Sequence, residues 1–119
     1  PCDSALAAAL LMRAALNELN ARRADRGLPA IENGIGLHFG EVLQGAIGSS
    51  DRKDFTVIGD TVNSASRIEG LCKEFGTDLV FSDAVYAGAS PAVQQRCRSV
   101  GTARVKGREQ EIRLWTIDA

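Results

Sequence analysis

Several residue types are scarce in this chain of 119 residues, which has one histidine, one tryptophan, one tyrosine and one methionine. The net charge is also small: the chain has 14 basic and 15 acidic residues, which give a formal charge of -1. This balance gives no general electrostatic argument for binding nucleic acid or a membrane surface. We therefore expect neither partner.

Long hydrophobic runs are absent as well. The longest apolar segment, residues 5–16, is rich in alanine, short, and interrupted by Arg13, so it does not predict a transmembrane span. It has no basic region before it, which is unlike a signal peptide. Cys2, Cys72 and Cys97 are odd in number and show no paired or metal-ligand spacing, which indicates a reducing, cytoplasmic environment.

Length and pattern predict one α+β domain with helices packed on a mostly antiparallel sheet. Good helix formers dominate the N-terminal segment, with Asp3 or Ser4 as its N-cap. Ser82 or Asp83 is expected to cap a later helix, and Gly76 to end an earlier one. We expect helices over residues 3–24, 61–75 and 84–88, and strands over residues 31–39, 42–47, 54–58, 78–81, 97–105 and 111–117.

The strand over 31–39 alternates in character. Ile35, Leu37 and Phe39 are expected on one face, with Gly34, Gly36 and His38 on the other. Glycines at alternate positions permit close approach of a backbone, helix or ligand. The single histidine is interpreted as a packed, hydrogen-bonded residue without a chemical role.

Residues 55–67 form the stretch of greatest chemical interest. β-Branched and aromatic residues run from Phe55 to Ile58, Gly59 follows, and a helical apolar stripe begins at Val62. Asn63 and Arg67 are one helical turn apart on the same side. A helix start, an amide and a guanidinium suit a phosphate and a sugar oxygen. The alternative is an ordinary solvated helix face, which spacing alone does not exclude.

The order of several motifs resembles the class III nucleotidyl cyclases, across essentially the whole chain. The matching blocks are residues 34–42, 45–48, 51–56, 57–63 with Ala65, Arg67 and Glu69, and 105–107. The resemblance implies a ferredoxin-like cyclase fold that acts as a head-to-tail homodimer or pseudo-dimer, with active sites at the interface. It implies formation of 3′,5′-cyclic nucleotide and pyrophosphate from a nucleoside triphosphate.

The resemblance assigns roles by position. Asn63 matches the asparagine that positions the ribose, and Arg67 the arginine that stabilises the transition-state phosphate. Lys106 matches a lysine that contacts the terminal phosphates. Thr56 matches the residue that selects the purine, with Val57 and Ile58 lining the base pocket.

Thr56 resembles a bacterial subgroup related to the bicarbonate-responsive cyclases, whereas animal membrane-type adenylate cyclases carry aspartate there. A hydroxyl can still accept a hydrogen bond from the adenine amino group, which favours ATP. The lysine that usually works with this position is absent from the sequence. We therefore predict an adenylate cyclase, with a guanylate cyclase or a non-catalytic, cyclase-like dimerisation or regulatory module as alternatives.

The family binds two Mg²⁺ or Mn²⁺ ions through two aspartates, in a first strand and a hairpin that precede the first helix here. The chain resembles the C-terminal two-thirds of that domain, so both ligands are expected upstream of Pro1. Asp60 occupies the helix-start position and is not assigned as a ligand. Residues 1–119 alone are expected to form a partial domain that binds no metal, is inactive, and exposes a sheet edge that favours dimerisation.

Overall fold

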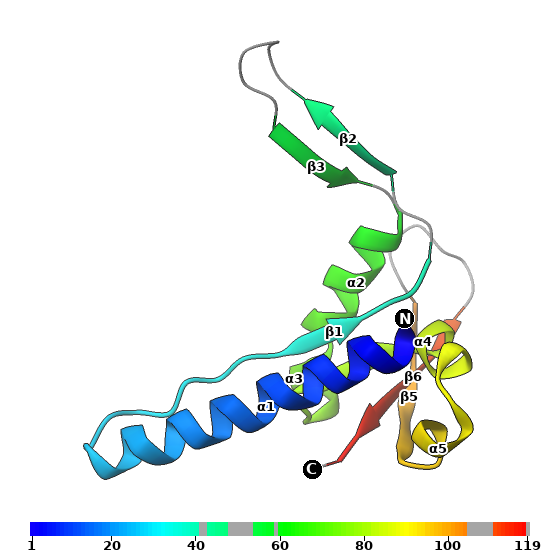
Figure 1. The fold of residues 1–119 in the computed structure, drawn as a ribbon. Helices are drawn as coiled ribbons and strands as arrows, with labels where there is room; N and C mark the ends of the chain where they lie inside the picture. The colour runs from blue at the N-terminus through cyan, green and yellow to red at the C-terminus, as the bar shows by residue number, and fades with distance from the viewer. Residues whose placement is uncertain (41–42, 48–53, 59, 105–110, 119) are drawn as a thin grey trace.

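The computed structural model describes residues 1–40, 43–47, 54–58, 60–104 and 111–118. Helices lie on both faces of a small sheet, and a separate hairpin extends beyond it (Figure 1). The elements are α1 (Cys2–Asp25), β1 (Ile35–Leu37), β2 (Leu43–Ile47), β3 (Asp54–Ile58), α2 (Asp60–Gly70), α3 (Cys72–Phe75), β4 (Leu79–Ser82), α4 (Asp83–Gly88), α5 (Pro91–Gln94), β5 (Cys97–Arg104) and β6 (Glu111–Ile117).

The main sheet has the strand order β1-β4-β6-β5, and β2 and β3 form a second, two-stranded sheet. Strands β1 and β4 are parallel, while β4–β6, β5–β6 and β2–β3 are antiparallel. The predicted α+β fold with a mostly antiparallel sheet is thus confirmed. In the described parts of the chain, no helix has the length and hydropathy needed to cross a bilayer.

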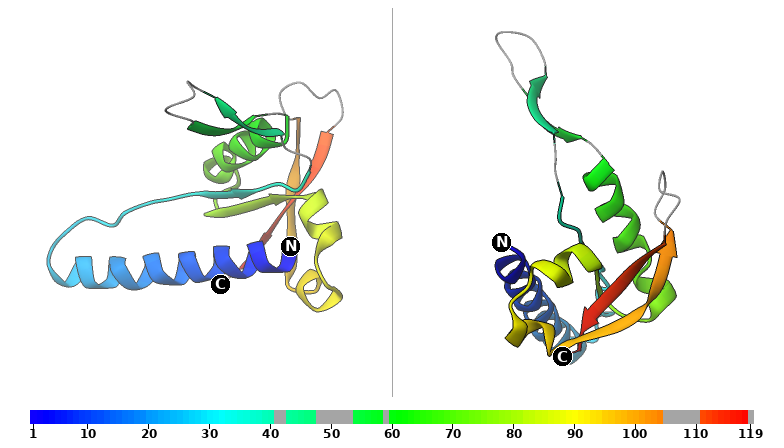
Figure 2. Two further views of the ribbon diagram at one scale, coloured as in Figure 1. Left: turned by 45° about the horizontal axis from the view of Figure 1, so that its top comes forward. Right: turned by 90° about the vertical axis from the view of Figure 1, so that its right-hand side faces the viewer.

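Strand β4 forms the centre of the core, since all four of its residues are buried. Because side chains alternate along a strand, Leu79 and Phe81 pack in the cluster that contains α1, and Val80 packs in the cluster that contains α2. Helices α1 and α2 therefore cover opposite faces of the same strand (Figure 2).

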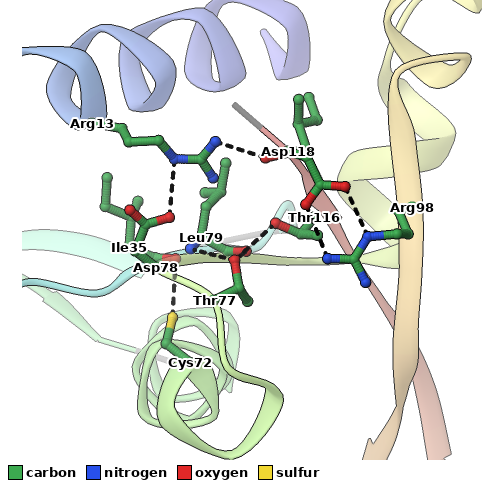
Figure 3. Close-up of polar contacts among 10 residues, drawn as sticks. Arg13, Ile35, Cys72, Thr77, Asp78, Leu79, Arg98, Thr116 and Asp118 are labelled. Carbon is green, nitrogen blue, oxygen red and sulfur yellow. Dashed lines mark hydrogen bonds and ion pairs between the residues drawn. The ribbon is translucent and has the colours of Figure 1, made fainter. Parts of the chain in front are cut away.

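Arg13, which interrupts the apolar run of α1, is 8% exposed. Its Nη1 donates to the Ile117 carbonyl oxygen at 2.7 Å, and its Nε lies 2.9 Å from Asp78 Oδ1 (Figure 3). The second contact is an ion pair in which the Nε–H is poorly aligned with the carboxylate. The buried guanidinium of Arg13 thus links α1 to the start of β4 and the end of β6.

The single helix predicted over 61–75 is wrong in one respect, because it breaks at Leu71. The Leu71 N–H donates to the Ile68 carbonyl at 3.0 Å, a tighter turn than the α-helical pattern, directly after Gly70. The four-residue α3 then ends at Gly76, whose φ of 65° confirms the predicted glycine C-cap.

The first strand is shorter than predicted, since only Ile35–Leu37 pair with β4. Phe39 therefore lies beyond the end of β1, and it is 51% exposed, whereas Ile35 and Leu37 are partly buried. The segment before β1 is bound to α1 instead. The Asn20 side chain donates to the Ile31 carbonyl at 2.9 Å and accepts from the Ile31 N–H at 2.8 Å.

Two predicted helix caps form other bonds. Asp3 lies inside α1 and accepts from the Ser90 N–H at 2.9 Å, while Pro1 occupies the N-cap position. Ser82 is the N-cap residue of α4, but its hydroxyl is hydrogen-bonded to His38 Nδ1 at 2.8 Å rather than to the helix. The interpretation of His38 as a packed, hydrogen-bonded residue is confirmed.

The C-terminal hairpin forms as predicted, with β5 and β6 antiparallel. Ile117 is 1% exposed and packs in the cluster that contains α1. Trp115 is half-buried and stacks on Tyr86 with ring centroids 3.8 Å apart, and its Nε1 donates to Asp83 at 2.9 Å. The short helix α5 was not predicted.

Candidate functional site

The predicted strand–turn–helix unit is present as β3 followed by α2. Strand β3 pairs antiparallel with β2, which places Thr56 opposite Gly45 and Ile58 opposite Leu43. This hairpin extends away from the main sheet beyond the N-terminal end of α2 (Figure 1). Residues 56–58 therefore lie in the strand that leads directly into the helix bearing Asn63 and Arg67.

Helix α2 is amphipathic, with a sharp division between its two sides. Ser64 is 1% exposed and Ile68 is 0% exposed, whereas Asn63 and Arg67 are both exposed. The amide and the guanidinium are four residues apart and therefore lie one turn from each other on the solvent side. Exposed and adjacent, they are available to an oxygen-rich ligand, because a guanidinium binds phosphate through paired N–H donors.

The buried side of α2 lies against the sheet. Ile68 and Leu71 pack in one cluster with Val80 of β4 and Leu114 of β6. The glycines of β1 permit the close approach that the sequence predicted: a Cβ built on Gly36 would lie 2.4 Å from the Glu69 backbone nitrogen. Hence the helix rests directly on the backbone of β1.

Cys72, the first residue of α3, has a structural role. The Cys72 thiol donates to the Ile35 carbonyl of β1, with 3.6 Å between sulfur and oxygen. Burial raises the pKa of the Cys72 thiol, and burial also raises the pKa of Cys97. All three cysteines are free thiols.

Two further assignments concern Lys106 and the metal ligands. Lys106 lies outside the described residues. Where the structure describes the chain, no three His, Cys, Asp or Glu side chains come together as metal ligands would.

A cleft of about 1070 Å³ lies between α1, the segment before β1, and α3. It reaches Glu69 and Gly70 at the C-terminal end of α2, but neither Asn63 nor Arg67 lines it. Arg13, Asn17 and Asn20 of α1 form its opposite wall. The cleft is thus separate from the predicted site, and sequence reasoning gave no sign of it because its walls come from segments far apart in the chain.

The chain is similar in sequence to several known proteins. The sequence pattern of the adenylate and guanylate cyclase catalytic domain matches residues 2–119. An adenylate cyclase of Anabaena cylindrica is 40% identical over 98% of this chain and 24% of its own length. Adenylate cyclase 1 of Rhizobium meliloti is 35% identical over 97% of this chain and 17% of its own length. The chain thus spans a quarter or less of these curated relatives.

Solved structures share the fold. The guanylyl cyclase Cya2 superposes with a TM-score of 0.76 at 30% identity, over 98% of this chain and 57% of that one. A bacterial light-regulated adenylyl cyclase gives a TM-score of 0.75 at 28% identity, over 98% of this chain and 33% of that one. The adenylyl cyclase CyaB from P. aeruginosa gives a TM-score of 0.78 at 22% identity, over 99% of this chain and 59% of that one.

Proposed function

The chain belongs to the adenylate and guanylate cyclase catalytic domain family, and on that basis we propose that it forms part of an adenylate cyclase that converts ATP to 3′,5′-cyclic AMP and pyrophosphate. The observation that carries the proposal is the exposed pair Asn63 and Arg67, one turn apart on the helix that follows β3. Its curated relatives in Anabaena cylindrica and Rhizobium meliloti, both named adenylate cyclases, support the choice of activity.

The reaction is in-line attack of the ribose 3′ hydroxyl oxygen on the α-phosphorus. A P–O bond forms to the 3′ oxygen, the bond to pyrophosphate breaks, and the hydroxyl proton is released to solvent. The Asn63 amide binds the ribose and holds the 3′ oxygen near the phosphorus, which lowers the entropic cost of reaction. Arg67 donates to the α-phosphate oxygens, where negative charge gathers in the transition state. Lys106 binds the departing pyrophosphate.

The base would lie against β3. In this proposal the Thr56 hydroxyl accepts from the adenine amino group, and Val57 and Ile58 line the pocket around the ring. The backbone of residues 56–58 leads directly into α2, so base and ribose contacts would come from one continuous segment.

Two parts of the site would come from outside residues 1–119. Mg²⁺ or Mn²⁺, which supplies charge neutralisation and nucleophile activation in such chemistry, would be held by aspartates upstream of Pro1. A second cyclase domain would complete the site in a homodimer or pseudo-dimer. Residues 1–119 by themselves are therefore proposed to be inactive, and the working protein is proposed to be cytoplasmic.

The test is production of cyclic nucleotide by the longer protein that contains this chain, compared with residues 1–119 alone. ATP and GTP are supplied in parallel, each with Mg²⁺ and with Mn²⁺. Cyclic AMP from the longer protein only is the expected result. Activity of residues 1–119 alone would contradict the proposed origin of the metal ligands, and no activity from either would favour a non-catalytic dimerisation or regulatory module.

Guanylate cyclase activity is the second candidate, because the guanylyl cyclase Cya2 is 30% identical over 98% of this chain. The same parallel assay decides between the two. A higher kcat/KM for GTP than for ATP would replace the adenylate assignment and reassign the role of Thr56.

A further inference from the structure

At Gly36, the backbone of strand β1 lies directly against the backbone of helix α2 at Glu69, with no side chain between them. A Cβ built on Gly36 would lie 2.4 Å from the Glu69 nitrogen, 2.7 Å from its Cα and 2.8 Å from its Cβ. Carbon atoms in contact normally stay about 3.5–4.0 Å apart, so no side chain fits there. Two of the three obstructing atoms are main chain and cannot rotate away.

Gly34, two residues earlier, differs in kind. A Cβ there would meet Glu69 Oε1 at 2.8 Å and Cys72 Sγ at 3.2 Å. The closer of these atoms is the end of a flexible side chain, which can change rotamer at small cost. Gly34 therefore tolerates a methyl group better than Gly36, although both face the same helix.

Strand β1 is held in place from its other sides. The Ile35 N–H donates to the Asp78 carbonyl at 2.8 Å, and Ile35 to Leu37 pair in register with β4. Ile35 and Leu37 pack against the cluster that contains α1. A methyl group on Gly36 would thus force α2 and β1 apart, and so change where α2 lies relative to the sheet.

Displacement of α2 bears directly on the candidate site. At about 100° per residue, Arg67 lies roughly 200° around the helix from Glu69, on the side away from β1. A shift of the helix at Glu69 therefore carries Arg67 outward, and Asn63 moves with it.

We propose that Gly36 is a positioning residue: its missing side chain sets the height of α2 above β1 and so places Arg67 and Asn63 for reaction. This inference rests on the proposed cyclase function for its catalytic consequence. The steric contact itself does not depend on that function.

The experiment compares three glycine-to-alanine variants in the longer protein, with Glu69→Ala added for one of them. Gly36→Ala should lower kcat about 10- to 100-fold, because a displacement near 1 Å costs up to about 100-fold. KM for ATP should change less than about threefold, since Arg67 acts mainly in the transition state. Gly70→Ala is the matched control: it lies on the same helix, and nothing is within 4 Å of its added Cβ.

Gly34→Ala completes the series and should lower kcat less than Gly36→Ala does. Because its closest obstruction is Glu69 Oε1, Glu69→Ala in the same chain should restore kcat toward that of Glu69→Ala alone. Assays are run well below the melting temperature (Tm) of each variant, so that every molecule counted is folded. If Gly36→Ala does not fold, Gly34→Ala decides: a lowered Tm together with a wild-type kcat would show that the contact can be strained without loss of activity, and would overturn the proposal.

A purely structural role predicts a different pattern. Gly36→Ala would then lower Tm yet keep a kcat within about twofold of Gly70→Ala, and the positioning role would be overturned. An unsubstituted protein that makes no cyclic nucleotide would instead refute the proposed function. The steric contact would still be testable in that case, because Gly36→Ala should lower Tm and Gly70→Ala should not.

Discussion

The two faces of β4 are covered by helices that are held in different ways. On one face, α1 packs through side chains, with Leu6 and Ala9 against Leu79 and Phe81. On the other face, α2 combines side-chain packing by Ile68 with the backbone contact at Gly36. Side chains in a packed core can take up an extra methylene by shifting rotamers, at a cost of about 1–3 kcal/mol, whereas two backbones in contact have no rotamers to change.

The difference teaches where precision is needed. Helix α1 holds no proposed catalytic group, and its buried face serves stability. Helix α2 carries Asn63 and Arg67, which must meet a ligand within a fraction of an ångström to be effective. The stricter contact thus occurs beneath the helix that bears the candidate site.

The largest effect should come from the α1 face. Phe81→Ala removes a fully buried aromatic ring and should lower the free energy of unfolding by about 3–5 kcal/mol. Urea denaturation of the longer protein measures the change. Leu11→Ala, at a site 72% exposed on α1, is the control and should change stability by less than about 0.5 kcal/mol. Equal losses would mean that this face does not form the core.

On the α2 face, the largest effect should fall on activity. Arg67→Ala should lower kcat about 10²- to 10³-fold, as expected when a charge-stabilising donor is lost. Stability should hardly change, because Arg67 is exposed. Arg22→Ala, an exposed arginine on α1 that is 3.8 Å from Glu18, controls for loss of charge. An unchanged kcat in the Arg67 variant would remove this residue from the mechanism.

Substitutions at the ion pair between Arg13 and Asp78 should lower the free energy of unfolding by an intermediate amount. Asp78→Asn leaves the Arg13 guanidinium buried beside a neutral partner and should cost about 1–3 kcal/mol of stability. Arg13→Met also removes the hydrogen bond to the buried Ile117 carbonyl and leaves that acceptor unsatisfied, so it should cost more than Asp78→Asn. The order of the two Tm values tests this reasoning, and the reverse order would contradict it.

A smaller effect is expected in the proposed base pocket. Thr56→Val should change the ratio of kcat/KM for ATP over GTP by about two- to tenfold, the worth of one hydrogen bond. Thr56→Ser keeps the hydroxyl and should keep the ratio. If both variants behave as wild type does, Thr56 does not read the base.

The smallest effect concerns the surface ion pair at the end of β6. Arg98 donates two hydrogen bonds to Asp118, at 2.9 and 3.0 Å, and these hold the pKa of Asp118 below its ordinary value. A depressed carboxylate pKa contributes stability above the ordinary value, and that contribution is lost as pH falls through the folded-state pKa. The Tm difference between wild type and Asp118→Asn should therefore be slight at pH 7 and should shrink as the pH falls below the ordinary carboxylate pKa.

Sequence reasoning predicted the elements whose signals are local. The strand at 54–58, the glycine cap at Gly76 and the C-terminal hairpin each follow from a few adjacent residues, and each is confirmed. The exposed positions of Asn63 and Arg67 followed from helical periodicity in the same way. Their catalytic roles came from the family resemblance and remain predictions.

The features that sequence reasoning missed depend on contacts between distant segments. Arg13 reads as an interruption of an apolar helix, because its partners lie 65 and 104 positions away. The exposure of Phe39 depends on how far β1 pairs with β4, which alternation alone does not fix. Gly36 signalled a close approach, but only the structure identifies Glu69 as the segment approached.

Strand β4 also has a consequence for the exchange of backbone hydrogens with solvent. It is bonded to β1 on one side and β6 on the other, and all four of its residues are buried. Its amide protons should exchange only when the whole domain unfolds, and so report the global free energy of unfolding. Amides in β3, which pairs with β2 in the two-stranded sheet of the described residues, should exchange through local opening at much faster rates.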